Sequence, residues 1–213
     1  MLKYIVVGGG FAFAAAVQPG PLQAFLLSRV ASSGWRRTLP AAFAPVLSDI
    51  PIALVVLTVL HRVAGGFERF LRGAGGVVLL VFAVTAFLEW RRAAAGIPFS
   101  GRSAPRTLLD AVVVNIVNPN PYIAWSLVLG PLALEAWAEA PSKAIALVAS
   151  FYLVMVLGLA AFILLVGATS YLGPRGRRAL LLASSVVLAA LGVWSLVSVA
   201  TGAPSTPTAP STG

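Results

Sequence analysis

Six long apolar stretches are the feature of this chain that most restricts its fold. They cover residues 4–28, 38–60, 73–88, 111–134, 144–167 and 179–200, and the only charged residue within them is Asp49. A helix needs about 20 apolar residues to cross a bilayer, and tilt or local thinning can absorb the shortness of the third stretch. With 59% hydrophobic residues and a mean hydropathy of +0.95, the chain is predicted to be an all-α integral membrane protein of six transmembrane helices.

These helices are predicted to form a single membrane domain over residues 1–200. The tail, residues 201–213, contains only Thr, Gly, Ala, Pro and Ser, a composition that builds no core and predicts disorder. The first residues also resemble a cleavable signal peptide, with Lys3 before an apolar run that reaches a row of alanines. Because the apolar run continues to Leu27, we favour a first helix that stays in the protein.

The basic residues predict how the chain is oriented. Of 15 Lys and Arg, ten follow the first, third and fifth spans and five lie on the other side. By the positive-inside rule, both termini lie outside the cytoplasm, in a multi-pass protein of the inner (plasma) membrane. These charges suit the anionic headgroups of the lipid bilayer, so no nucleic-acid partner is expected despite the net charge of +9.

The scarcity of reactive side chains excludes several functions. The chain has no cysteine and one histidine, His61, which excludes disulfides, thiol chemistry and a Cys/His metal site. Pairs of a nucleophile and a base are scarce as well. We therefore predict no metal, no cofactor and no catalytic residues, and we disfavour a membrane enzyme.

Two similar proline motifs lie one hundred residues apart. Residues 17–21 read Val-Gln-Pro-Gly-Pro in the first span, and residues 117–121 read Val-Asn-Pro-Asn-Pro in the fourth. The recurrence predicts two three-helix repeats, residues 4–92 and 106–200, which the odd number of helices turns into inverted repeats. In secondary transporters of this plan, the solute site lies near the midplane, where interrupted helices of the two halves meet.

Proline chemistry explains why these motifs are candidate solute contacts. Each proline lacks an N–H and clashes with the preceding turn, so carbonyls near residues 14–17 and 114–117 lose helical partners. Such carbonyls cannot face lipid and need protein or a wet cavity. The predicted site residues of the motifs are Gln18, Pro19, Gly20, Pro21, Asn118, Pro119, Asn120 and Pro121. Simple proline kinks, which membrane helices tolerate, are the alternative.

Asp49 lies in the middle of the second span, eleven residues from either end. A charge at that depth costs about 2.5–3.5 kcal/mol on insertion scales, so we expect it to face the interior. There it would bind a substrate ammonium group or carry a coupling proton. The alternative is a structural carboxyl that is protonated or accepts a hydrogen bond, for example from Ser48. Asp110, near the start of the fourth span, is assigned to the helix dipole.

Two neighbours of the second motif complete the candidates. Asn115 lies three residues before Asn118 and extends its polar face, with helix–helix hydrogen bonding as the alternative role. Trp125, four residues after Pro121, is a candidate for lining a cavity, with anchoring at the membrane interface as its alternative.

Together, a Pro-Gly-Pro in the first span, an Asp in the second and an Asn-Pro in the fourth resemble the LysE-type amino-acid exporters. The resemblance covers nearly all of residues 4–200, and residues 19–21 and 115–119 look like the two signatures of that family. It implies secondary efflux of amino acids and related small solutes, driven by an ion gradient of protons or sodium, and a homodimer. The Asn-Pro-Asn-Pro form of the second motif indicates a divergent branch.

The predicted function is therefore export of a small-molecule solute by alternating access, with two alternatives left open. A non-transporting membrane scaffold or assembly protein would give no reason for Asp49 at the midplane opposite two interrupted helices, and solute flux separates these hypotheses. Export of a metal or other ion is the second alternative. One carboxylate with amide and carbonyl oxygens is a poor transition-metal site.

Overall fold

The structure, a computed structural model, describes residues 1–18, 20–56, 64–95, 103–168 and 173–201. All regular secondary structure in these ranges is helical. Three of these described helices are long and apolar enough to cross a membrane, and counting each of two bent pairs as one span gives five. The expected all-α membrane architecture is present, while the expected six spans are found only in part. The predicted disordered tail lies outside the described residues, except for Thr201, which ends the last helix.

The described helices fall into two runs of the chain. The first run contains α1 (Leu2–Val17), α2 (Pro21–Ser33), α3 (Trp35–Thr38), the 3₁₀ helix η1 (Leu39–Phe43), α4 (Ala44–Val55) and α5 (Ala64–Ala94). The second contains α6 (Ala104–Ile116), α7 (Pro119–Ala124), the π-helix η3 (Trp125–Leu129), α8 (Gly130–Glu139), α9 (Pro141–Ala168) and α10 (Gly173–Thr201).

The helix is interrupted at both proline motifs, as the sequence predicts. α1 and α2 meet at 58°, and α6 meets the run from α7 to α8 at 57°. α2 begins with Pro21 and α7 begins with Pro119. Proline suits the first position of a helix, because the N–H that it lacks has no helical partner there. Each of these two expected spans therefore consists of two segments that point in different directions, and we call the two interruptions the first break and the second break.

The second expected span, residues 38–60, is not one helix. It begins at the end of α3 and continues through η1 into α4, and its residues 57–60 lie outside the described residues. Pro40 lies in η1, Pro45 near the start of α4 and Pro51 inside α4. Pro40 and Pro45 lie at the starts of η1 and α4, where the missing N–H separates one segment from the next, whereas α4 continues through Pro51.

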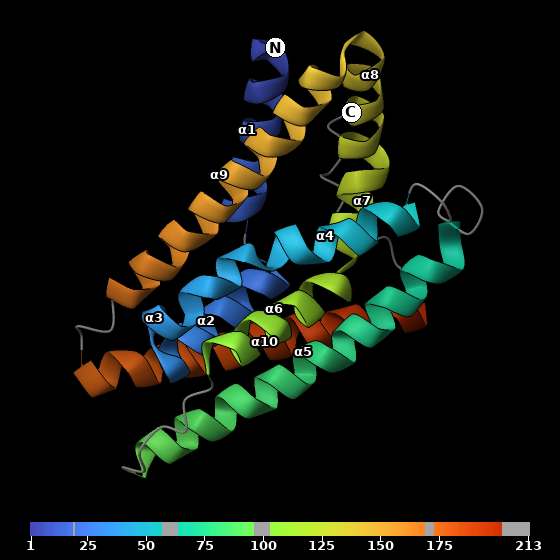
Figure 1. Ribbon diagram of the computed structural model, residues 1–213. Helices are drawn as coiled ribbons and strands as arrows, with labels where there is room; N and C mark the ends of the chain where they lie inside the picture. The colour runs from blue at the N-terminus through green and yellow to red at the C-terminus, as the bar shows by residue number, and fades with distance from the viewer. Residues whose placement is uncertain (19, 57–63, 96–102, 169–172, 202–213) are drawn as a thin grey trace, which may run out of the picture.

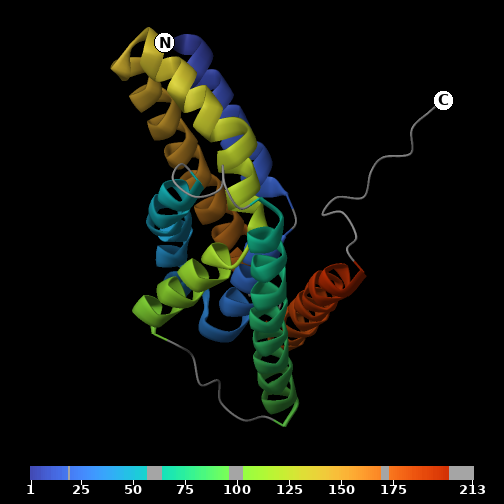
Figure 2. The same ribbon diagram turned by 90° about the vertical axis from the view of Figure 1, so that its right-hand side faces the viewer.

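The helices pack in three groups. α1, α8 and α9 stand together at the top of Figure 1, α5 and α10 lie side by side below, and α2, α4 and α6 lie between them. Figure 2 shows the same grouping from the side. Each of the two broken spans therefore runs from the upper group to the middle group, and its break lies where the groups meet.

The helix surfaces are typical of a membrane protein, both where helices contact one another and where they face outward. A Cβ added to Gly76 of α5 would lie 3.0 Å from the carbonyl oxygen of Gly192 on α10, so glycine allows these two helices to approach closely, as small residues do in membranes. Elsewhere large apolar side chains are exposed, among them Leu153 and Leu157 of α9. An apolar outer face with helical backbone suits lipid.

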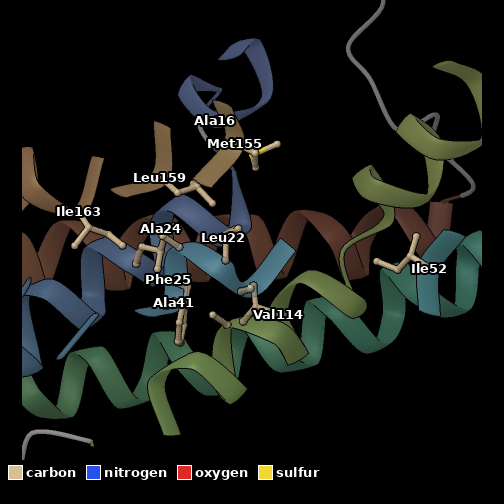
Figure 3. Close-up of a cluster of buried hydrophobic side chains, with 14 of the residues drawn as sticks. Ala16, Leu22, Ala24, Phe25, Ala41, Ile52, Val114, Met155, Leu159 and Ile163 are labelled. Atoms are coloured by element: carbon tan, nitrogen blue, oxygen red, sulfur yellow. The ribbon is translucent and has the colours of Figure 1, made fainter. Parts of the chain in front are cut away.

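The main core joins the middle group to α9. Phe25 of α2 and Ile163 of α9 are fully buried and belong to one cluster with Ile52 of α4 and Val114 of α6, as Figure 3 shows. Within a membrane such side chains hold helices together by van der Waals packing rather than by leaving water. Because the core links α2, α4, α6 and α9, it fixes the segments from which the polar residues beside both breaks project.

Candidate functional site

A cavity of about 390 Å³ lies where the two breaks meet. Small-molecule sites typically measure about 300–1,000 Å³. Eight of the ten predicted site residues line this cavity: Gln18, Gly20, Pro21, Asp49, Asn115, Asn118, Asn120 and Pro121. Pro19 lies outside the described residues, and Pro119 begins α7 without lining the cavity. Two motifs that are one hundred residues apart in sequence thus contribute to one cavity.

An apolar wall faces these polar groups. Phe11 of α1 stacks on Phe151 of α9 with ring centroids 6.1 Å apart, and Met155 and Leu159 of α9 extend the wall. Of the described residues that line the cavity, Asp49 is the only charged one. The cavity therefore combines apolar surface, amide groups and a single carboxylate.

Asp49 of α4 is 4% exposed, and both of its oxygens accept hydrogen bonds. Oδ1 accepts from Asn115 Nδ2 at 3.2 Å and lies 3.5 Å from the Ser48 hydroxyl. Oδ2 accepts from Trp125 Nε1 at 3.4 Å and from the Tyr152 hydroxyl at 3.2 Å. Side chains from α6, η3 and α9 thus converge on one carboxylate of α4.

All of these donors are neutral. Within the part of the chain that the structure describes, Asp49 forms no ion pair with Lys, Arg or His. Neutral donors satisfy the lone pairs of a carboxylate, but a buried charge is most stable beside an opposite charge. The arrangement therefore favours a cationic group supplied by a ligand. The described residues contain no group of three His, Cys, Asp or Glu that could hold a metal ion.

Gln23 bridges the first break. Its Nε2 donates to the carbonyl oxygens of Ala15 and Ala16 at 3.2 Å each, so a side chain of α2 satisfies the last turn of α1. Carbonyls at this motif are expected to face protein or a wet cavity, and at these two carbonyls the partner is the protein's own side-chain amide. At the start of α2, Gly20 provides no side-chain cap.

The second break has a cap of its own. Asn118 Oδ1 accepts from the backbone N–H of Asn120 at 3.1 Å, and Asn is among the preferred residues at such a position. One turn earlier, Asn115 donates to the Ser48 hydroxyl at 2.6 Å as well as to Asp49. The polar residues of this motif therefore contact α4 and the start of α7, and they line the cavity at the same time.

Most of the chain matches one known family. The family model described as LysE type translocator matches residues 13–199. The chain belongs to the LysE type translocator family. The protein is therefore a multi-pass membrane exporter of small solutes rather than an enzyme. Neither the comparison with curated proteins nor the comparison with solved structures gave a match.

Sequence reasoning missed two polar residues of this LysE type translocator, Gln23 and Tyr152. Tyr152 lies in the middle of the apolar stretch 144–167, and Gln23 follows the first motif by two residues. A polar side chain deep in an apolar span is expensive unless it has a partner, and that rule could have found both. Trp125, for which two roles were open, lines the cavity.

Asp110 of the translocator has a partner that sequence reasoning did not assign. Its Oδ2 lies 3.7 Å from Nη2 of Arg29. The Arg29 guanidinium also lies over the rings of Phe25 and Phe82, 5.0 and 5.3 Å from their centroids. In place of the expected interaction with the helix dipole, Asp110 thus forms an ion pair between α6 and α2. Neither charged residue lines the cavity.

Proposed function

We propose that this translocator is a secondary transporter that exports amino acids or similar small polar solutes by alternating access around the cavity. The observation that carries the proposal is Asp49, a buried carboxylate without a basic partner among the described residues, in a cavity that both motifs line. Secondary transporters place their solute sites where broken helices of two halves meet. The eight predicted residues that line the cavity are the proposed solute contacts.

The chemistry of the cavity favours a solute with an ammonium group. Asp49 offers that group an opposite charge, and the side-chain amides of Gln18 and Asn120 line the same space. A carboxylate on the same solute is attracted to the start of α2, where Gly20 leaves backbone N–H groups without a side-chain cap. An amino acid carries both groups on adjacent atoms.

Asp49 also accounts for coupling to an ion gradient. A proton or a sodium ion competes with the ammonium group for the same carboxylate, so the protein exchanges one cation for the other across the membrane. Each cation shifts the conformational equilibrium only by its differential affinity for the two states. This mechanism needs no second acidic group in the cavity.

For the membrane topology, we infer six spans in two inverted repeats within the inner (plasma) membrane. The similar bends of 58° and 57° near the start of each repeat support this. α3, the end of α5 and the starts of α6 and α10 gather at the left of Figure 1, and they carry most of the ten basic residues assigned to cytoplasmic connections. Both termini then lie outside the cytoplasm. The homodimer stays a prediction from the family.

Asp49→Asn tests the proposed function, because it keeps the side-chain volume and removes the charge. We expect export of an amino-acid panel from cells, and flux in proteoliposomes, to fall to background while membrane abundance stays unchanged. Glu135→Gln is the matched control, since this half-exposed acid of α8 lies outside the cavity. Full export by Asp49→Asn at matched protein level would mean that the carboxylate is structural. No flux of any solute through the unaltered protein would favour the scaffold alternative.

A further inference from the structure

Asp49 is hydrogen-bonded to both sides of the second break. Asn115, which donates to Oδ1 at 3.2 Å, belongs to α6 before the break, and Trp125, which donates to Oδ2 at 3.4 Å, belongs to η3 after it. The bend of 57° lies between these two residues. One carboxylate of α4 therefore ties together the two segments of the broken span.

We propose that Asn115 and Trp125 are positioning residues that couple the occupancy of Asp49 to the bend of the second break. The proposal rests on the proposed function, in which a cationic group of the solute binds Asp49. The negative charge of the carboxylate strengthens both hydrogen bonds. When the cationic group binds, it neutralises part of this charge and so weakens both bonds. The two segments are then held less tightly, and the bend changes.

The hydrogen bond from Trp125 to Asp49 makes the position of the η3 segment sensitive to whether the carboxylate is occupied. The Trp125 side chain is 8% exposed, and an indole has a single N–H donor, so this N–H loses its partner if the segment moves away. The segment itself is less regular than an ordinary helix: η3 is a π-helix, and Pro131 follows it near the start of α8. A proline cannot donate to the preceding turn, and π-helical turns occur often at functional sites.

Two other donors to Asp49 do not cross the bend. Tyr152 donates to Oδ2 from α9, and Ser48 is the neighbour of Asp49 in α4. These bonds hold the carboxylate in place without joining the segments of the broken span. Tyr152 is therefore a matched control for Trp125, because both side chains donate one bond to the same oxygen.

The experiment measures the bend directly by spin-label distances in nanodiscs. Because the chain has no cysteine, Leu109→Cys on α6 and Leu134→Cys on α8 place labels at exposed positions on either side of the bend. We expect Trp125→Phe to shift or broaden the distance distribution between the labels, and Asp49→Ala to do so more strongly. Tyr152→Phe should leave the distribution of the doubly labelled parent unchanged.

An unchanged distribution in Trp125→Phe, or an equal change in Tyr152→Phe, would overturn the coupling. If Trp125→Phe does not reach the membrane, Asn115→Ala tests the other tie with the same labels and the same expectation. The proposed function stands or fails separately, since it is decided by flux through Asp49→Asn. Loss of flux in that variant together with an unaltered bend in Trp125→Phe would reject the coupling alone.

Discussion

The two breaks bend by nearly the same angle, 58° and 57°, but different bonds hold them. At the first break, Gln23 of α2 reaches back to two carbonyls of α1. At the second break, α6 and η3 both bind Asp49 of a third element, α4. Similar proline motifs thus give similar bends, since prolines interrupt helices by themselves, whereas the bonds across each break depend on the surrounding residues.

The first break is thus bonded within its own span, whereas the bonds across the second break depend on a residue of the proposed solute site. The first break needs no residue beyond α1 and α2 for its bridging bonds. The second break shares Asp49 with the proposed ligand. Residues of both breaks line the cavity, so our expectation concerns the bonds across them. Changes to the bonds across the second break should alter transport more than changes to the bonds across the first. The ion pair between Arg29 of α2 and Asp110 of α6 joins the two broken spans.

The largest expected effect on stability comes from Asp110→Asn, which removes one partner of this ion pair. The Arg29 side chain is 5% exposed, and breaking a buried ion pair by removing one member costs about 3 kcal/mol. Thermal unfolding in detergent should show this loss. Glu135→Gln is the control, since the charge that it leaves without its ion pair, Lys3, is mostly exposed. Equal stabilities of the two variants would show that the Arg29 pair does not hold the broken spans together.

Two glycine-to-alanine variants, Gly75→Ala and Gly20→Ala, compare how closely the two breaks are packed. A Cβ on Gly75 of α5 would lie 2.6 Å from the carbonyl oxygen of Val117 beside the second break, so backbone must move. A Cβ on Gly20 at the first break would lie 3.3 Å from the side-chain oxygen of Gln23 and 3.9 Å, an ordinary contact distance, from the carbonyl oxygen of Gln18. We expect Gly75→Ala to cost about 2 kcal/mol and to reduce export, and Gly20→Ala to change stability by about 0.5 kcal/mol or less.

Thermal unfolding would check the stabilities of this pair, and flux at matched abundance would check Gly75→Ala, since Gly20 is itself a proposed solute contact. Gly20 has an extended backbone, with φ of −163°, so alanine adopts its conformation without strain. If Gly20→Ala proved as harmful as Gly75→Ala, the first break would be as closely packed as the second. The proposed difference between the breaks would then be wrong.

The helical fold could be predicted largely because its causes are local. Apolar stretches mark spans, and the prolines of both motifs mark the breaks, whatever the rest of the chain does. The division of residues 38–60 is not predicted, although its cause is also local: Pro40 and Pro45 lie where η1 and α4 begin. Its apolar composition alone suggested one span.

The candidate site could be predicted in its components but not in its bonds. Asp49 and the motif amides are conspicuous because polar groups are costly in an apolar span. That Tyr152 of α9 donates to Asp49, or that Gln23 turns back to α1, depends on which helices pack together and on how each is rotated. The sequence pattern of one span does not contain that information.

Gln23→Ala tests the bridge at the first break. It leaves the carbonyls of Ala15 and Ala16 without their side-chain donor, which costs about 1–2 kcal/mol because Gln23 is only partly buried. We expect lower stability in thermal unfolding and export at or near the parent level. Gln23→Met keeps the length without the donor and should behave in the same way. A collapse of export in both variants, at parent abundance, would place the first break in the transport cycle.

The smallest expected effect comes from Asn118→Ala, which removes the cap of α7 at the second break. Such a cap contributes about 1 kcal/mol, and the helix after it has other support, since Ser126 donates to the carbonyl of Tyr122 at 2.6 Å and Trp125 binds Asp49. Asn118→Asp keeps an acceptor for the Asn120 N–H and should retain the parent's stability in thermal unfolding. Because Asn118 also lines the cavity, adding this second carboxylate should alter export even though the cap is intact. A loss of stability in Asn118→Ala larger than that in Gln23→Ala would mean that the second break rests on its own cap, like the first on Gln23, and not on Asp49.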